Sequence, residues 1–182
     1  YEGTGDAESG LIEGTFTQMG QSIPLRLRKT EASVQRKMQD PVPPYPYLAE
    51  DIRFTQQKEG FLLAGTITRP KGSGPFPAVV LVSGSGSQDR DETLFGHKPF
   101  LVLADALTRA GIVVLRYDDR GFAESAGDTS AATTLDLADD AQAAVEYLKS
   151  LSYVDTTSIG IIGHSEGAIL APFVARRNKD VS

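Results

Sequence analysis

The residues best suited to chemistry in this sequence are Gly163, Ser165 and Gly167, which are spaced as G-x-S-x-G. The β-rich run 158–162 precedes them, and the helix-favouring run 168–175 follows. Between a strand and a helix, such a motif makes a sharp turn that lifts the serine hydroxyl above the sheet. Glycines on both sides leave room for the strained serine backbone and for the close approach of helix and strand. We therefore predict that Ser165 is a nucleophile.

A serine that attacks a carbonyl carbon needs N–H donors for the negative charge that develops on the carbonyl oxygen. We predict that one donor is the backbone N–H of Glu166, the residue after the nucleophile. We expect the second donor in the loop 83–88, whose glycines free the backbone to turn its N–H groups toward the site. Within that loop, the N–H of Ser85 is our first choice and that of Gly86 our second.

Two other features invite competing interpretations. The loop 83–89 also fits G-x-G-x-x-D, an incomplete dinucleotide fingerprint, but Asp89 replaces the third glycine and no acidic residue clearly ends the next strand. His97 lies where the first crossover helix should begin, and we favour capping or packing there over a place at the rim of a pocket. No histidine–carboxylate spacing indicates a metal site.

Charged residues gather in two segments, 89–92 and 118–121, each following a strand that we expect to be parallel to its neighbours. Ligands bind at the carboxyl ends of such strands, so these residues could contact a substrate. We favour the alternative that they form a lattice of ion pairs, which braces the loops without taking part in catalysis.

Composition narrows the classes of function. The net charge of −6 and the scattered basic residues argue against a nucleic-acid partner. A hydrophobic content of 40% and a charged content of 23% are typical of a soluble globular protein. Cysteine is absent, which excludes disulfides and thiolate metal sites, and no apolar run is long enough for a transmembrane helix. The first residue is Tyr1 rather than methionine, which suggests processing or trimming upstream.

The chain should begin with an N-terminal β-hairpin segment over residues 1–39. Its first ten residues are rich in Gly, Glu, Asp and Ser and predict a frayed terminus. Strands are expected at 11–17 and 22–29, joined around residues 19–21. Residues 40–50 contain four prolines and are expected to be a semi-rigid linker.

From residue 51 to residue 182, strands and helices alternate, which predicts an α/β fold with a parallel-sheet core and helices on both faces. Thr134 is expected to cap a long helix that runs to about Lys149, with Ala138, Ala141, Val145 and Leu148 facing inward. The expected strands are 52–57, 61–69, 78–82, 112–115 and 158–162, and a further helix is expected at 99–110.

Taken together, these motifs resemble the α/β-hydrolase superfamily, and within it the bacterial serine-hydrolase branch of esterases and S9/S33-type peptidase-like hydrolases. The resemblance runs from about Asp51 to Val181. It rests on motifs at 65–70, 74–77, 83–86, 88–91, 96–100, 116–121 and 163–167. The sequence departs from the familiar pattern at Ser83 and Gly84, where a His-Gly pair commonly opens the loop.

The resemblance implies an α/β-hydrolase fold that stops after the nucleophile turn, and a serine hydrolase of carboxylic (acyl) esters that works through an acyl-enzyme without a cofactor. It also implies a triad Asp and His downstream of Ser165. The sequence holds two histidines, His97 and His164, and we do not expect His164 to reach the hydroxyl of its neighbour. We therefore expect the acid and base beyond Ser182, on the same or a separate chain, and little activity from these residues alone.

Several alternatives stay open. A serine peptidase or thioesterase of the same fold would carry the same motif, and a half-hydrolase could serve as a non-catalytic binding module. The expected partner is a small, neutral ester substrate, with no nucleic acid and no membrane, and a homo-oligomer stays open. Relatives of this kind often carry export signals, which favours a periplasmic or secreted location.

Overall fold

The structure is a computed structural model of the chain, and it describes residues 2–6, 10–18, 20–28 and 38–181. The chain divides into two compact units, Tyr1–Gln35 and Arg36–Ser182, which we describe separately. The boundaries that we place after residues 39 and 50 stay predictions.

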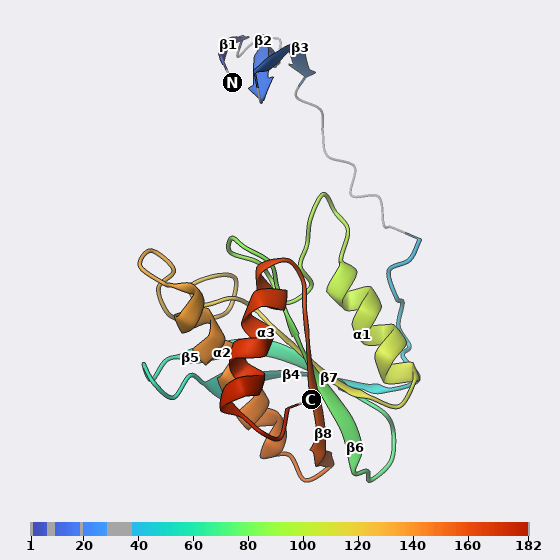
Figure 1. The fold of residues 1–182 in the computed structure, drawn as a ribbon. Helices are drawn as coiled ribbons and strands as arrows, with labels where there is room; N and C mark the ends of the chain where they lie inside the picture. The colour runs from blue at the N-terminus through green and yellow to red at the C-terminus, as the bar shows by residue number, and fades with distance from the viewer. Residues whose placement is uncertain (1, 7–9, 19, 29–37, 182) are drawn as a thin grey trace. The chain divides into compact units, whose positions relative to one another are not determined.

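The first unit is an antiparallel sheet in the order β1-β2-β3, formed by Glu2–Asp6, Leu11–Gln18 and Gln21–Arg28 (Figure 1). Strands β2 and β3 are the predicted hairpin, with Gln18 opposite Gln21 and Gly20 in the turn at a φ of +78°. Met19, which we placed in the same turn, lies outside the described residues. The frayed terminus predicted before this hairpin is wrong for β1, which pairs with β2. Ladder hydrogen bonds join main-chain groups, so even a glycine-rich stretch can add a strand.

The second unit contains a five-stranded sheet in the order β4-β5-β7-β6-β8 (Figure 1). In chain order, its strands are Leu48–Thr55 (β4), Leu62–Arg69 (β5), Phe76–Val82 (β6), Val113–Tyr117 (β7) and Val154–Gly163 (β8). The pairs β4–β5 and β5–β7 are antiparallel, whereas β6 runs parallel to both of its neighbours, β7 and β8. Strand β7 is buried along its whole length, including Arg116, as expected for a central strand of a sheet that is covered on both faces.

Three helices cover the two faces of this sheet, namely Pro99–Arg109 (α1), Thr134–Lys149 (α2) and Glu166–Arg177 (α3). Helix α1 packs through Phe100 and Ala104 on one face, against Val79, Leu81 and Val114. Helices α2 and α3 pack on the opposite face. The same strands contribute to both hydrophobic clusters, because alternate residues of a strand point to opposite sides of the sheet. The predicted α/β fold with helices on both faces is confirmed.

The cap of α2 differs from the prediction by one residue. Thr133, not Thr134, holds the N-cap position, and its hydroxyl accepts a hydrogen bond from the backbone N–H of Asp136. The Asp136 carboxylate in turn accepts from the backbone N–H of Thr133, which completes a capping box. Thr134 is therefore the first helical residue, and its hydroxyl is directed elsewhere. The four predicted inward-facing residues of this helix are all buried.

Apolar side chains are exposed beside β8, which is an edge strand of the sheet in the described part of the chain. Ile162 at the end of this strand, and Ile169 and Phe173 on α3, are 38%, 59% and 41% exposed. Among the described residues, no helix combines the length and the apolar character that crossing a membrane requires.

Candidate active site

Ser165 lies in a strained turn between β8 and α3. Its backbone has φ +51° and ψ −113°, a conformation that residues other than glycine rarely adopt. The backbone N–H of His164 donates to the carbonyl oxygen of Val82 at 3.0 Å, and the N–H of Gly167 donates to the carbonyl oxygen of His164 at 2.8 Å. These bonds join the turn to the end of β6, and they leave the Ser165 side chain exposed.

The two glycines of the motif are required by the backbone that surrounds them. A Cβ atom on Gly163 would overlap the carbonyl group of Gly167. A Cβ atom on Gly167 would overlap the carbonyl oxygen of Val82 and would lie 2.7 Å from that of Ser83. Strand, turn and helix can therefore approach this closely only when both positions lack a side chain, which is the reason that we predicted.

The loop with the predicted second donor lies directly beside the nucleophile. A Cβ atom on Gly84 would be 3.1 Å from the Cβ atom of Ser165, so the Gly84 backbone lies close to the Ser165 side chain. Among the described residues, neither the N–H of Ser85 nor that of Glu166 has a hydrogen-bond acceptor. Gly86 has a φ of +89°, which favours glycine at our second-choice position. The roles of these donors stay predictions.

Glu92 joins the loop to the turn, and we did not single it out from the sequence. Its side chain is buried, and its Oε1 atom accepts from the backbone N–H of Gly84 at 2.9 Å and lies 2.6 Å from Nδ1 of His164. The His164 ring is therefore hydrogen-bonded to the Glu92 carboxylate and not to the Ser165 hydroxyl. We predicted that His164 does not reach this hydroxyl. Glu92 also has a φ of +51°. No local sequence signal indicates these contacts, because the partners are 8 and 72 residues away.

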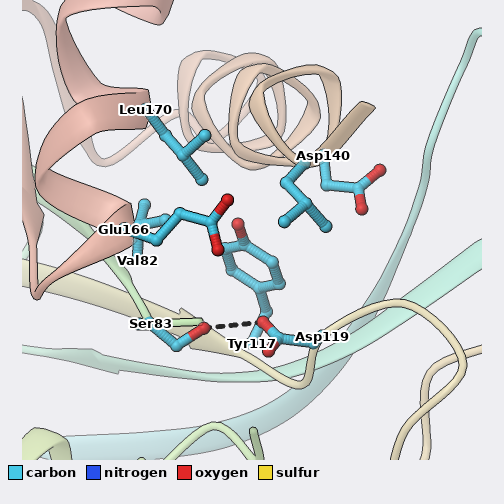
Figure 2. A pocket seen from close by; sticks show the side chains of 9 residues that line it. Val82, Ser83, Tyr117, Asp119, Asp140, Glu166 and Leu170 are labelled. Atoms are coloured by element: carbon cyan, nitrogen blue, oxygen red, sulfur yellow. Dashed lines mark hydrogen bonds between the residues drawn. The ribbon is translucent and has the colours of Figure 1, made fainter. Parts of the chain in front are cut away.

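Asp119 holds the same loop from the other side (Figure 2). Its carboxylate accepts from the Ser83 hydroxyl at 2.7 Å and from the backbone N–H of Gln88 at 2.8 Å. Its own N–H donates to the carbonyl oxygen of Gln88 at 3.0 Å. The pKa of Asp119 is raised to about 6, chiefly because its carboxyl group is buried, and the nearby carboxylates of Asp140 and Asp118 contribute to the same rise. The hydrogen bonds from Ser83 and Gln88 oppose this rise.

Arg90, Asp91, Asp118 and Arg120, which follow β6 and β7, form ion pairs as predicted, whereas Asp89 accepts hydrogen bonds from the backbone N–H groups of Asp91 and Thr93. Arg90 binds both carboxylate oxygens of Asp118, at 2.6 and 3.0 Å. Arg120 binds both oxygens of Asp140, each at 2.7 Å, and all four of these side chains are largely buried. Arg116 pairs with Asp91. The predicted ion pairing is thus confirmed for these residues, and the absence of a catalytic role stays a prediction, whereas Asp119 lines the cleft.

A polar cleft of about 550 Å³ opens next to the turn. Its lining includes Gly86, Ser87, Asp119, Thr133 and Glu166. A much smaller pocket adjoins it, into which the Glu166 carboxylate and the Tyr117 hydroxyl project (Figure 2). Glu166 also accepts a hydrogen bond from the Thr134 hydroxyl at 3.0 Å, which connects the first turns of α2 and α3. Within the described part of the chain, no lysine or arginine lines either of these two pockets.

His97 takes no part in this site. It is exposed, its Nδ1 atom lies 2.9 Å from Nε2 of Gln39, and it lines a separate apolar cavity of about 580 Å³ that also includes Leu94 and Phe95. The capping interpretation is wrong, because Lys98 holds the N-cap position of α1 and this cap has no side-chain hydrogen bond. Packing at the loop–helix junction, the other role that we favoured, agrees with the two backbone hydrogen bonds that His97 exchanges with Leu94. His97 does not line the cleft beside Ser165.

The dinucleotide interpretation of the loop is also disfavoured by the fold. In that motif the glycines lead directly into a helix, whose N-terminus binds the pyrophosphate. Here α1 begins only at Pro99, well after the glycine-rich segment 83–89. Among the described residues, no group of His, Asp and Glu side chains is arranged to hold a metal ion.

Comparisons with known proteins identify a family and a curated relative for this chain. The profile of the family described as X-Pro dipeptidyl-peptidase (S15 family) matches residues 59–181. Esterase EstD of Thermotoga maritima is 40% identical over 151 residues, which is 83% of this chain and 35% of the esterase. The chain therefore spans about a third of the length of that curated relative.

Solved structures share the fold. The α/β-hydrolase GrgF from Penicillium superposes with a TM-score of 0.64 at 24% identity, over 74% of this chain and 43% of GrgF. The esterase Pf2001 of Pyrococcus furiosus gives a TM-score of 0.60 at 23% identity, over 74% of this chain and 49% of the esterase.

Proposed function

Because the chain belongs to the X-Pro dipeptidyl-peptidase (S15) family and has an esterase-like α/β-hydrolase fold, we propose that the whole protein hydrolyses carboxylic esters by attack of Ser165. The observation that carries this proposal is the strained turn at Ser165, which exposes one hydroxyl between a strand end and a helix start. A backbone conformation that costs about 1–3 kcal/mol needs a reason, and nucleophilic catalysis supplies one.

In the proposed reaction, the Ser165 oxygen attacks the ester carbonyl carbon and loses its proton to a general base. The N–H groups of Glu166 and Ser85 donate to the resulting oxyanion, and the tetrahedral intermediate collapses to an acyl-enzyme as the protonated alcohol leaves. Water then attacks the acyl-enzyme, releases the carboxylic acid and regenerates the serine. Neither His97 nor His164 is bonded to Ser165 in the described structure, so we propose that the base and its acid partner follow residue 182.

The charges of the cleft support neutral rather than anionic esters as substrates. Its lining includes the carboxylates of Asp119 and Glu166 and, among the described residues, no lysine or arginine that could pair with a phosphate or a carboxylate of the substrate. An acyl-CoA or another polyanionic ester would therefore be repelled. Small or medium neutral acyl esters are the proposed substrates.

Peptide hydrolysis is the second candidate, and the description of the family favours it. The identity with an esterase over most of this chain favours ester hydrolysis. A panel of p-nitrophenyl esters, acyl-CoA thioesters and X-Pro p-nitroanilides, assayed on the whole protein, separates the candidates. A higher kcat/KM for an anilide or a thioester than for every ester would reject our substrate class while leaving Ser165 in place.

The role of Ser165 is tested by labelling the whole protein with a fluorophosphonate, which reacts with activated serines. We expect wild type to be labelled and Ser165→Ala to be unlabelled, with kcat for p-nitrophenyl butyrate at least about 10⁴-fold lower. Ser158→Ala, which changes a serine earlier in β8, is the control and should be labelled like wild type. A binding module without catalysis predicts no labelling of wild type, and that result would reject the proposal.

A further inference from the structure

We propose that Glu92 and Asp119 together position the segment 84–88, which carries the second oxyanion donor, against Ser165. This inference rests on the proposed function, because it concerns the geometry of that reaction. Neither carboxylate is proposed to touch the substrate. Each acts through the backbone of the loop, and together they bind the loop at its two ends.

Glu92 fixes the first end of the segment. Its Oε1 atom accepts from the N–H of Gly84 at 2.9 Å and lies 2.6 Å from Nδ1 of His164, the residue before the nucleophile. One buried oxygen atom thus contacts both the loop and the turn. Because Gly84 also lies against the Cβ atom of Ser165, a shift of Glu92 would move the loop relative to the hydroxyl.

Asp119 fixes the second end, at Gln88, and also binds Ser83, which directly precedes the segment. The three hydrogen bonds are 2.7 to 3.0 Å long and use both carboxylate oxygens and the N–H of Asp119. Asp119 itself follows β7, a fully buried strand. The loop is therefore bonded to the end of a fully buried strand, and Gln88 cannot move without breaking two hydrogen bonds to Asp119.

Side-chain packing does not hold the middle of the segment in place. Ser85, Gly86 and Ser87 are exposed, and no heavy atom lies within 4 Å of the position that a Cβ atom on Gly86 would take. The N–H of Ser85 has no acceptor among the described residues, so no internal hydrogen bond orients it. Its direction is set by the two ends of the segment, which the carboxylates hold. Preorganised donors of this kind stabilise a transition state only if they are already aimed at the oxyanion.

The test compares Glu92→Ala, Glu92→Gln, Asp119→Ala and Asp119→Asn in the whole protein, with p-nitrophenyl butyrate as the substrate. Misplacement by about 1 Å can cost about 100-fold in rate, so we expect each alanine variant to lose about 100-fold in kcat. We expect KM to change by less than about threefold, because the donor acts in the transition state. The amide variants keep an acceptor oxygen for the loop N–H and should recover kcat to within about tenfold of wild type.

Asp105→Asn is the matched control, because Asp105 is a half-buried carboxylate on α1 that bonds Tyr47 and Arg109 rather than the loop. Rates are expressed per folded molecule, with the folded fraction taken from circular dichroism. The inference is rejected if the alanine variants keep kcat within about threefold of wild type, or if the amide variants lose as much kcat as the alanine variants. Wild-type activity that survives in Ser165→Ala would instead reject the proposed function.

Discussion

The turn around Ser165 and the segment 84–88 lie side by side, yet different forces hold them in place. The turn is held by backbone sterics, since Gly163 and Gly167 pack against main-chain atoms at distances that no Cβ atom would permit. The segment is exposed in its middle and is held at its ends by the carboxylates of Glu92 and Asp119. One region depends on missing side chains, and the other depends on two side chains from outside it.

This difference predicts how each region responds to change. Backbone overlap cannot be relieved by rotating a side chain, so substitutions in the turn should disturb both folding and activity. A carboxylate that accepts hydrogen bonds can be replaced in part by an amide, so the segment should tolerate conservative changes and respond to pH. The three predictions below test this contrast, in order of decreasing effect.

The largest effect is expected from Gly163→Ala and Gly167→Ala. Each new methyl group would overlap backbone atoms, and we expect a loss of about 3 kcal/mol or more in the free energy of unfolding. We also expect no detectable labelling of Ser165 by a fluorophosphonate, because β8 and α3 must separate to make room. Urea denaturation and gel-based labelling measure the two effects. Normal stability in both variants would show that the turn is not held by sterics.

A smaller effect is expected from the titration of Asp119. Its pKa is raised from 3.8 to about 6, with burial as the main cause. A carboxyl with a raised pKa in the folded state stabilises the fold below its unfolded pKa, and this contribution is lost as the pH rises through about 6. The Asp119→Asn variant lacks this pH-dependent contribution, because an amide does not titrate. The free energy of unfolding of the variant should therefore rise relative to that of wild type, by about 2 kcal/mol between about pH 4 and pH 7.

Urea denaturation of both proteins across this pH range measures the difference. The groups that face Asp119 are the carboxylates of Asp118, Asp140 and Glu166, together with the hydroxyls of Ser83 and Tyr117. All of these are present in both proteins, so their titration largely cancels in the comparison. A difference that does not change with pH would show that the pKa of Asp119 is not raised.

The smallest effect is expected from Gly86→Ala, which is also the control for the two glycines of the turn. Gly86 has a φ of +89°, but a Cβ atom there would meet nothing within 4 Å. Only the backbone strain is felt, so we expect a loss of about 1–2 kcal/mol in the free energy of unfolding. A loss as large as that of Gly167→Ala would remove the distinction between the two regions.

The same contrast explains how much could be predicted from the sequence. The turn is local, and five consecutive residues between a strand and a helix were enough to predict its geometry and the need for both glycines. The sheet and its helices followed from apolar runs and stripes, as for β7 and α2. By contrast, the contacts of Glu92 depend on partners up to 72 residues away, and no local pattern indicates them.

Two further differences have similar causes. Strand β1 was missed because its glycine-rich sequence has little β propensity, and its main-chain hydrogen bonds to β2 do not depend on side-chain type. Asp119 was assigned to the ion-pair lattice together with Asp118, although the two neighbours point to different partners. Along a chain that has just left a strand, successive side chains point to opposite sides, and only the fold shows which one faces the site.

The strained backbone of Ser165 has a practical consequence for protein engineering. Glycine adopts a positive φ at little cost, so Ser165→Gly would relieve about 1–3 kcal/mol of strain while removing the hydroxyl. A library selected for heat resistance alone would therefore enrich this replacement and return a more stable protein that, under the proposed mechanism, is inactive. Any directed evolution of this chain toward thermostability needs an activity screen in every round.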